Sequence, residues 1–481
     1  RTSRRGGIGI AVLTAVYAVA AFTGLGSARD PQRFCTLEAG ESATLALDGV
    51  HSIDTVWYYT GLYTGEYTLA YSDDGITYTA AGTMPQGYAD LFKWLHPQPA
   101  DTAPATAAYV RVTASAHLEL GELALYDPQG KRIAVREIMG PASAAALCDE
   151  ADTVPASSTY FNSSYFDEIY HARTAYEHLR GVYPYEGSPP PLGKEILSLG
   201  IVLFGMTPFG WRCMGALFGV AMLPLMWNLL RRMFRDDRVA LCGTALLAFD
   251  FMHLTQTRIA TIDSFATLFI LLMYLFLYRY FTEGRLRHLA ACGIAFGVGA
   301  ATKWTCLYAG AGLGVLWALH WVFQGVQAHR DGDGRRYVRR LVSNIGFCLV
   351  FFVLVPGIIY YASYYPYGAA RGLHGAGMYF TREYAAIVLE NQRFMFTYHA
   401  GLVATHPYAS RWWQWLLDLR PILYYLSYGD GTVSTIGAFV NPLLCWGGLL
   451  AVIGCGILAI KDWDSRAAFI VTSTQGSSCA R

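Results

Sequence analysis

The chain has 481 residues, of which 54% are hydrophobic and only 15% are charged, and its mean hydropathy is +0.29. This composition is too apolar for an ordinary soluble domain of this length, and it excludes a disordered chain. The 36 Lys and Arg residues nearly balance the 35 Asp and Glu residues, so no basic excess indicates a nucleic-acid partner. The composition therefore predicts an integral membrane protein.

Eight apolar stretches approach the length of about 20 residues that a helix needs to cross a bilayer core of roughly 30 Å. They cover residues 8–25, 211–230, 239–253, 262–280, 286–302, 305–323, 341–362 and 435–460. Several are short or contain Gly and Pro, which helices packed among other helices tolerate. The expected fold class is a polytopic α-helical membrane protein with about eight spans.

Basic residues mark every other connection between these stretches. Such clusters begin at Arg1, Arg231, Arg279, Arg330 and Lys461. Because loops rich in Lys and Arg stay in the cytoplasm, the N-terminus is expected there, and residues 26–210 and 363–433 are expected on the outer side. A cleaved signal peptide is the alternative for the first stretch, and it would leave the following residues on the same side.

The first outer segment contains a predicted β domain at about residues 37–135. Residues 67–71 and 76–78 are expected to form two strands around the turn at Asp73-Asp74-Gly75, and residues 109–112 and 123–127 two more. The order of these stretches resembles the discoidin-like, galactose-binding-like sandwich, which implies sugar binding. A spacer without a ligand site is the alternative, weighted about equally. Cys35 and Cys148 bracket the domain, and the sequence leaves open whether they form a disulfide or stay free thiols.

Two adjacent acids, Asp167 and Glu168, precede the second apolar stretch on the outer side. A carboxylate within reach of an acceptor hydroxyl can take its proton as a bond forms, and a neighbouring acid can hold the acceptor or tune the first pKa. Taken alone, such a pair is more often a solvated charge in an exposed loop. Three prolines, 189–191, then lead into a predicted interfacial helix. Lys194 at its start is expected at headgroup level, facing a phosphate or simply snorkelling.

Seven stretches between about residues 161 and 446 resemble glycosyltransferase family 39, the polyprenyl- or dolichyl-phosphate-mannose:protein O-mannosyltransferases. They are FDEIYHARTAYEHL from Phe166, PPLGKEILSLGI from Pro190, MTPFGWR from Met206, TRIATIDSF from Thr257, TKWT from Thr302, YHAGLVATHPYASRWWQW from Tyr398 and RPILYY from Arg420. They occur in the order of the family, which also keeps the first span. Two positions depart from the family pattern: Pro189 stands where the family has His, and Leu416 where it has Pro.

The resemblance implies a GT-C transferase that moves mannose from a lipid phosphate to Ser or Thr hydroxyls with inversion, without a metal or another cofactor. It implies Asp167 as the catalytic base and Glu168 as its partner. A single displacement needs one base and a good leaving group, and no protein nucleophile. The leaving phosphate needs positive charge. The candidates for that role are Arg258 and Lys194, then Lys303 and Arg420.

Other roles stay open for several of these residues. Arg258 could instead pair with Asp250 or Asp263 and hold helices together. In the second outer segment, four residues are candidates for an acceptor or carrier groove, and for the tryptophans an interfacial aromatic belt is the slightly favoured alternative. These four are His399, His406, Trp412 and Trp413.

The predicted organisation has six parts. They are a first span (1–30), the β-sandwich (31–150), an outer catalytic loop with an interfacial helix (151–210), a transmembrane bundle (211–362), a second outer loop (363–433) and a last span (434–481) beyond which the sequence is expected to continue. The β-sandwich suggests a bacterial plasma-membrane relative, with a lipid-linked mannose donor, a protein or glycan acceptor and lipid as partners, and an oligomer left open. The alternatives are transfer to a cell-wall glycan or lipid and, from another class, a sugar sensor or transporter. Few charges lie within the spans and no inverted repeat is evident, which disfavours transport.

Overall fold

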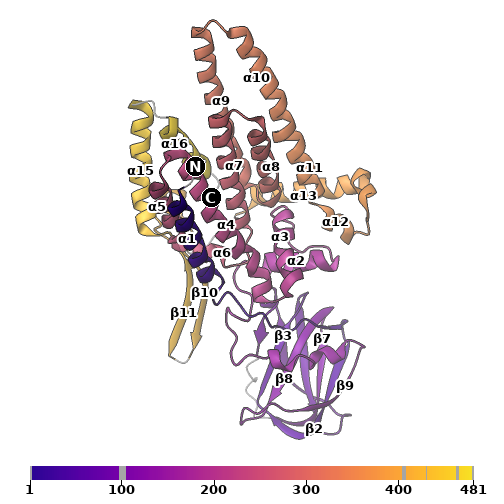
Figure 1. Cartoon of the computed structure of the whole chain (residues 1–481). Helices are drawn as coiled ribbons and strands as arrows, with labels where there is room; N and C mark the ends of the chain where they lie inside the picture. The colour runs from indigo at the N-terminus through magenta and orange to yellow at the C-terminus, as the bar shows by residue number, and fades with distance from the viewer. Residues whose placement is uncertain (1–2, 97–104, 404–407, 430, 462–464, 479–481) are drawn as a thin grey trace.

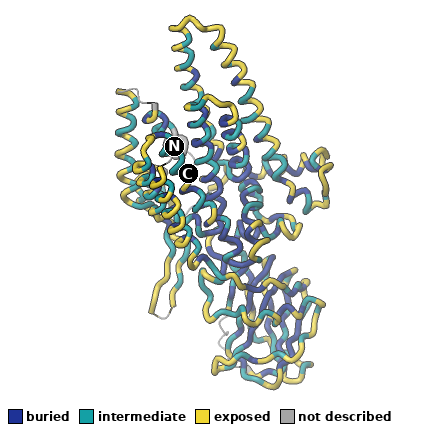
Figure 2. Tube along the Cα trace, in the orientation of Figure 1, coloured by how far each residue is buried: buried dark blue, intermediate teal, exposed yellow. Residues whose placement is uncertain are grey.

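The computed structural model describes residues 3–96, 105–403, 408–429, 431–461 and 465–478. A bundle of helices forms one part of the molecule and a β-sandwich lies at one end of it (Figure 1). Buried residues fill the centre of both parts. The turn of the bundle farthest from the sandwich is largely exposed, and so is a β-hairpin that lies beside the bundle near the sandwich (Figure 2).

Six helical segments of the described chain are long and apolar enough to cross a membrane. They are α1 (Arg4–Phe22), α4 (Pro208–Phe234), α7 (Asp263–Glu283), α9 (Thr305–Arg330), the continuous stretch Gly334–Ala370 and α15 (Pro442–Lys461). The stretch Gly334–Ala370 contains α10 (Gly334–Leu349), a π-helical turn (Val350–Leu354), α11 (Val355–Ala362) and α12 (Tyr365–Ala370). Membrane-spanning helices are therefore present as predicted, whereas the count of eight stays a prediction.

Two of the expected spans are helical but do not meet the length criterion alone. Residues 239–253 fall on α5 (Asp237–Ala248) and α6 (Phe251–Thr257), which meet at an angle of 59°. The break has a local cause, because the Asp250 side chain accepts a hydrogen bond from the His253 backbone amide at 3.1 Å and so begins a new helix. Residues 286–302 form α8 (Leu286–Thr302), a shorter apolar helix. Together, α5 and α6 are long and apolar enough to cross a membrane as one bent span.

The predicted boundary of the last span is wrong at its start. Residues 435–438 belong to strand β11 (Thr432–Ala438), which pairs with β10 (Ile422–Gly429), and α15 begins only at Pro442. β-branched residues of this stretch favour a strand, and proline suits the first turn of a helix. The predicted last span contains a second helix beyond α15, α16 (Ser465–Ser478). The Phe469 ring of α16 lies 5.3 Å from the Tyr278 ring of α7.

The basic ends of the helices meet at one end of the bundle. Asp237, at the start of α5, accepts a hydrogen bond from the Ser3 backbone amide at 3.0 Å and pairs with Arg231. Glu283, at the end of α7, pairs with Arg232 at 2.9 Å and with His288 at 2.8 Å. The turn between α9 and α10 also lies away from the sandwich (Figure 1). Three of the basic connections therefore lie away from the sandwich, and the membrane topology stays a prediction.

The β-sandwich has two antiparallel sheets. One has the strand order β1-β8-β3-β6 and the other β5-β4-β7-β2-β9. The strands are β1 (Cys35–Leu37), β2 (Ser42–Ile53), β3 (Thr55–Thr60), β4 (Gly65–Ser72), β5 (Thr79–Gln86), β6 (Trp94–Leu95), β7 (Ala105–Ala114), β8 (Leu118–Tyr126) and β9 (Val135–Met139). Alternate side chains enter a common core that includes Leu45, Tyr67, Val112 and Leu123.

The strand expected at 76–78 is wrong, because β5 starts at Thr79. The Asp74 carboxylate accepts hydrogen bonds from the Ile76 and Thr77 backbone amides, both at 2.8 Å, and this holds those residues in the turn. Cys35 and Cys148 are both free thiols, so the open alternative of a disulfide is not realised in the structure.

The sandwich is joined to two helices of the first outer segment, α2 (Glu168–Arg180) and α3 (Leu192–Phe204). Phe92 and Trp94 from the sandwich share one buried cluster with Ala172 and Ala175 of α2 and with Leu197 of α3. An apolar junction of this kind fixes α2, and with it the residue that precedes α2, relative to the sandwich.

The second outer segment is also folded. It contains α13 (Arg382–Gly401), the short helix α14 (Trp412–Leu416) and the hairpin β10–β11. Asn391 of α13 donates a hydrogen bond to the Gly187 carbonyl of the first outer segment at 2.9 Å, and it accepts one from the Tyr364 hydroxyl at 2.7 Å. The two outer segments therefore pack against each other beside α2.

Candidate active site

Asp167 lies at the start of α2, directly after Phe166, whose backbone has a positive φ of 50°. A left-handed conformation is uncommon for a bulky residue and persists where the surroundings impose it. Asp167 is half-buried, and burial is the main reason that its pKa rises from 3.8 to about 6. The Asp263 charge raises this pKa further, Lys303 lowers it, and Glu186 raises it.

An ion pair lies beside Asp167. Asp263 is the first residue of α7, and Lys303 follows the last residue of α8. The Lys303 ammonium and the Asp263 carboxylate are 2.5 Å apart, and both side chains are partly exposed. Two carboxylates and one lysine thus meet at the ends of three helices, an arrangement that can take up a proton and balance an anion.

Tyr424 of β10 completes this group. Its ring centroid lies 4.4 Å from that of Phe166, and its hydroxyl donates a hydrogen bond to the side-chain carbonyl of Gln256 in α6. Tyr424 and Gln256 were not predicted as site residues, although Tyr424 falls within the RPILYY stretch that resembles the family. Only the folded hairpin shows which side chain of that stretch reaches the site.

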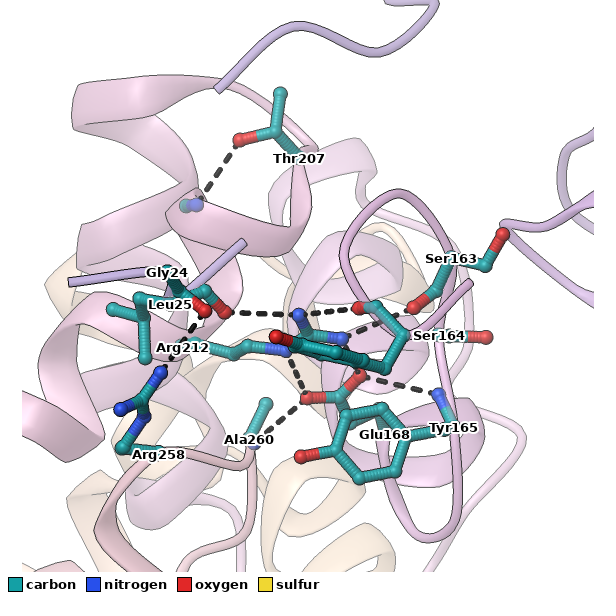
Figure 3. Close-up of polar contacts among 12 residues, drawn as sticks. Gly24, Leu25, Ser163, Ser164, Tyr165, Glu168, Thr207, Arg212, Arg258 and Ala260 are labelled. Carbon is teal, nitrogen blue, oxygen red and sulfur yellow. Dashed lines mark hydrogen bonds and ion pairs between the residues drawn. The ribbon is translucent and has the colours of Figure 1, made fainter. Parts of the chain in front are cut away.

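Glu168 lies in a different environment from its neighbour. Its side chain is fully buried and faces Arg212 of α4, which is also fully buried (Figure 3). The Arg212 guanidinium donates to the two Glu168 oxygens at 2.6 and 2.7 Å. The backbone amides of Ala260 and Tyr165 donate to the same carboxylate at 3.1 and 3.2 Å. Glu168 is therefore satisfied by protein groups, and its role as partner of the base stays a prediction.

Arg212 connects four parts of the chain. Besides Glu168, its guanidinium donates to the carbonyls of Leu25 at 3.0 Å, Tyr160 at 2.7 Å and Ser163 at 3.0 Å (Figure 3). All five N–H groups of the side chain thus have an acceptor. A guanidinium with every donor used, in a buried pair, fixes the geometry of the chain around it. Arg212 was part of a recognised stretch, but its role was not predicted.

Arg258 and Lys194, two of the cations predicted to bind the donor phosphate, instead donate hydrogen bonds to backbone carbonyls. Arg258 donates to the carbonyls of Ala20, Thr23 and Gly24 at 3.0, 2.8 and 2.9 Å, and so caps the C-terminal end of α1. The alternative that Arg258 pairs with Asp250 or Asp263 is not what the structure shows. Asp263 pairs instead with Lys303.

Lys194 is fully buried among protein groups, so it is not a snorkelling lysine at the protein surface. Its ammonium donates to the carbonyls of Glu186 at 2.9 Å and of Ser188 and Pro189, both at 3.2 Å. Burial lowers the pKa of Lys194 from 10.5 to about 8. The lysine thus holds the proline-rich turn before α3 in place.

The other two cations differ in position. Arg420 is exposed, donates to the Ala409 carbonyl at 2.6 Å and lies over the Tyr408 ring at 5.3 Å. Lys303 pairs with Asp263 and acts electrostatically on Asp167, whose pKa it lowers. Of the four predicted phosphate ligands, Lys303 is the one that the structure brings to the candidate base.

The predicted acceptor or carrier residues are described only in part. His399 of α13 is exposed, and its Nε2 atom lies 3.2 Å from the Ser188 hydroxyl. Its ring centroid is 6.0 Å from that of Trp304, which follows Lys303, so His399 lies near the site. Trp413 is exposed on α14. His406 and the side chain of Trp412 lie outside the described residues.

Two family models match the chain. The model described as dolichyl-phosphate-mannose-protein mannosyltransferase matches residues 156–367, and the one described as the C-terminal four-transmembrane region of protein O-mannosyltransferase matches residues 385–475. The first match includes Asp167, Asp263 and Lys303, and the second includes Tyr424. The strands β1 to β9 lie outside both.

Among curated relatives, the polyprenol-phosphate-mannose–protein mannosyltransferase of Mycobacterium tuberculosis (strain H37Rv) is 28% identical over 352 residues, which are 62% of this chain and 66% of the relative. The protein of the same name from Mycolicibacterium smegmatis is 26% identical over 65% of this chain and 70% of its own. The chain thus spans about two thirds of the length of the curated relatives it matches.

Two solved structures are similar at low scores. The S. cerevisiae protein O-mannosyltransferase Pmt1-Pmt2 complex bound to the sugar donor is 22% identical, with a TM-score of 0.38, over 44% of this chain and 32% of that chain. The arabinosyltransferase EmbB from Mycobacterium smegmatis is 13% identical, with a TM-score of 0.30, over 99% of this chain and 53% of that chain.

By its helices, the protein belongs to the class of polytopic α-helical membrane proteins, here with a β-sandwich at one end of the bundle. Within that class, the chain belongs to the dolichyl-phosphate-mannose-protein mannosyltransferase family. This confirms the family resemblance of the seven sequence stretches. The resemblance of the sandwich to discoidin-like domains stays a prediction.

Proposed function

We propose that the protein transfers mannose from a polyprenyl-phosphate carrier to Ser or Thr hydroxyls of proteins on the outer side of a bacterial plasma membrane. The observation that carries this proposal is the half-buried Asp167 carboxylate, with its pKa raised to about 6, beside the Lys303–Asp263 ion pair. A pKa just below neutrality leaves most of the carboxylate ionised at pH 7 and makes it a stronger base than an ordinary aspartate.

The reaction is a single displacement with inversion at the anomeric carbon. The acceptor oxygen forms a bond to that carbon while its proton moves to the Asp167 carboxylate. The bond from the same carbon to the phosphate oxygen breaks, and its electron pair leaves with the lipid phosphate. No protein nucleophile takes part.

Lys303 is our candidate for the positive charge on the leaving phosphate. It is the predicted phosphate ligand beside Asp167, whereas Arg258 and Lys194 are each bonded to three backbone carbonyls. A lysine held at one side by Asp263 keeps donors free for a phosphate oxygen.

The orientation follows from the distribution of charge. The Arg-rich connections gather at the end of the bundle away from the sandwich and away from α2 (Figure 1). With the basic end in the cytoplasm, the N-terminus is cytoplasmic, and Asp167 and the sandwich face the outer side.

The test is transfer of radiolabelled mannose from polyprenyl-phosphate-mannose into protein, with membranes that contain equal amounts of wild type or Asp167→Asn. A matched control is Asp73→Asn, the same change at an exposed acid in a turn of the sandwich. We expect label in protein with the wild type and the control, and at least a 100-fold lower rate with Asp167→Asn.

Label in a glycan or lipid would keep the enzyme and change its acceptor. No label with the wild type would contradict the proposed donor, and a sugar-sensing role would then be tested by binding of mannose to the chain.

A further inference from the structure

The hairpin β10–β11 comes from the last fifth of the chain and projects beside the bundle toward the end that carries the sandwich (Figure 1). Its pairing is irregular next to the site. Leu423 lies opposite Gly437 and Tyr425 opposite Ile436, which leaves Tyr424 as an extra residue. A bulge of this kind redirects a side chain out of the regular alternation, and bulges are frequent beside active sites.

The two neighbouring tyrosines contact the loop of residues 160–166, which leads into Asp167. The Tyr425 ring centroid lies 5.8 Å from those of Tyr160 and Tyr165. The Tyr424 ring contacts Phe166, and its hydroxyl is anchored on Gln256. Arg212 also holds this loop, through hydrogen bonds to the Tyr160 and Ser163 carbonyls.

The base of the hairpin is fixed to the bundle. The Asn441 backbone amide donates to the Asp250 carboxylate at 2.9 Å, and the Asn441 side chain donates to the Phe249 carbonyl at 3.0 Å. These contacts join the end of the hairpin to the bend between α5 and α6. The Val440 amide also donates to the Asp418 carboxylate at 2.8 Å, which closes the segment that contains both strands. The segment that carries Tyr424 is thus fixed at both of its ends, before β10 and after β11.

We propose that the β10–β11 hairpin clamps the loop of residues 160–166 and that Tyr424 is a positioning residue that shields the Asp167 carboxyl from water. The inference rests on the proposed function in so far as Asp167 is taken as the base. The Tyr424 ring packs against Phe166, the residue with positive φ that precedes Asp167, so the clamp also explains why that backbone conformation is kept.

The shielding has a measurable consequence for acid–base behaviour. The charged groups that act on Asp167 are Asp263 from α7, Lys303 after α8 and Glu186 from the turn before α3, and Tyr424 adds a neutral phenol from β10. Because burial is the largest cause of the raised Asp167 pKa, loss of the Tyr424 ring should let water in and lower that pKa.

The first test is the pH profile of mannose transfer for three variants. Tyr424→Ala removes ring and hydroxyl, Tyr424→Phe keeps the ring, and Tyr428→Ala is the control at a residue of the same strand that is 75% exposed. We expect Tyr424→Ala to move the acidic limb about one pH unit lower and to reduce the rate about tenfold. Tyr424→Phe should restore the position of the limb. An unmoved limb in Tyr424→Ala, or an equal shift in Tyr428→Ala, would overturn the shielding role.

The second test does not depend on turnover. Hydrogen–deuterium exchange of the peptide that covers residues 160–170 should be faster in Tyr424→Ala and Tyr425→Ala than in the wild type, and unchanged in Tyr428→Ala. Equal exchange in all four proteins would refute the clamp even where the wild type transfers mannose. If the wild type transfers no mannose, the proposed function fails, and the exchange rates still decide whether the clamp exists.

Discussion

Asp167 and Glu168 are neighbours in the sequence, yet they belong to two regions with opposite properties. Glu168 and Arg212 form a buried pair in which the carboxylate accepts four hydrogen bonds from the protein. Asp167 lies half-buried beside the partly exposed pair of Lys303 and Asp263. One acid of the motif is thus bonded within the protein core, whereas the other is the carboxylate that we propose as the base.

The largest expected effect is on stability, at the buried pair. Arg212→Met leaves the fully buried Glu168 carboxylate without its cation, and removal of one partner from such a pair costs about 3–5 kcal/mol. We expect a marked fall in the midpoint of thermal unfolding in detergent. Arg258→Met is the control, because among the described residues Arg258 donates to backbone carbonyls and pairs with no buried acid, so its loss should lower the midpoint much less. Equal midpoints for the two variants would contradict a stabilising role of the Glu168–Arg212 pair.

The next largest effect is on the KM for the lipid-linked sugar donor, at Lys303. Lys303→Met removes a charged donor to the proposed phosphate, a contact worth about 1.5–3 kcal/mol, or roughly a 10- to 150-fold rise in the KM for the lipid-linked sugar. The acidic limb of the transfer rate should move to higher pH, because Lys303 lowers the pKa of Asp167. Initial rates at varied donor concentration and pH measure both changes. A KM within twofold of the wild type would remove Lys303 from the donor site.

A smaller effect sharpens the assignment of the base. In the wild type, transfer should rise with pH through about 6, since the reaction needs the ionised Asp167 carboxylate. Asp263→Asn removes a negative charge that raises this pKa, so the limb should move to lower pH by up to about one unit. The measurement is the rate between pH 4.5 and 8, with Asp73→Asn as the unshifted control. A limb that moves upward would contradict the assignment.

The smallest effect is a pH dependence of stability at Lys194. Its folded pKa of about 8 lies below the ordinary value of 10.5, so the unfolded chain binds more protons between these values. Stability therefore rises with pH in that window, by about 1 kcal/mol between pH 8 and 9. In Lys194→Met this rise should be absent from the unfolding midpoints. The same rise in both proteins would assign it to other groups.

Local patterns were enough to predict the membrane helices and three strands of the sandwich, β4, β7 and β8. Apolar length identifies α4 or α9, and alternation identifies β4 or β7, because both signals lie within one element. The same signals failed where pairing decides the structure. Residues 435–438 are apolar enough for a span but pair with β10, and residues 76–78 alternate like a strand but are held in a turn by Asp74.

The site was predictable only in part. The motif pointed to Asp167, which the structure describes as half-buried at the start of α2, and its role as the base stays a proposal. The sequence shows that Arg258 and Lys194 are charged, but not that each is already bonded to backbone carbonyls. Tyr424 and Gln256 lie far from Asp167 along the chain, so no local signal could join them to it.

The most direct test of the account compares Asp167→Asn and Glu168→Gln in one experiment, with mannose transfer and the thermal unfolding midpoint measured on the same preparations. We predict that Asp167→Asn loses at least 100-fold in transfer at an unchanged midpoint. We also predict that Glu168→Gln unfolds at a much lower temperature, because Arg212 is left as a buried charge without its partner. Near wild-type transfer by Asp167→Asn, or a wild-type midpoint for Glu168→Gln, would contradict the account.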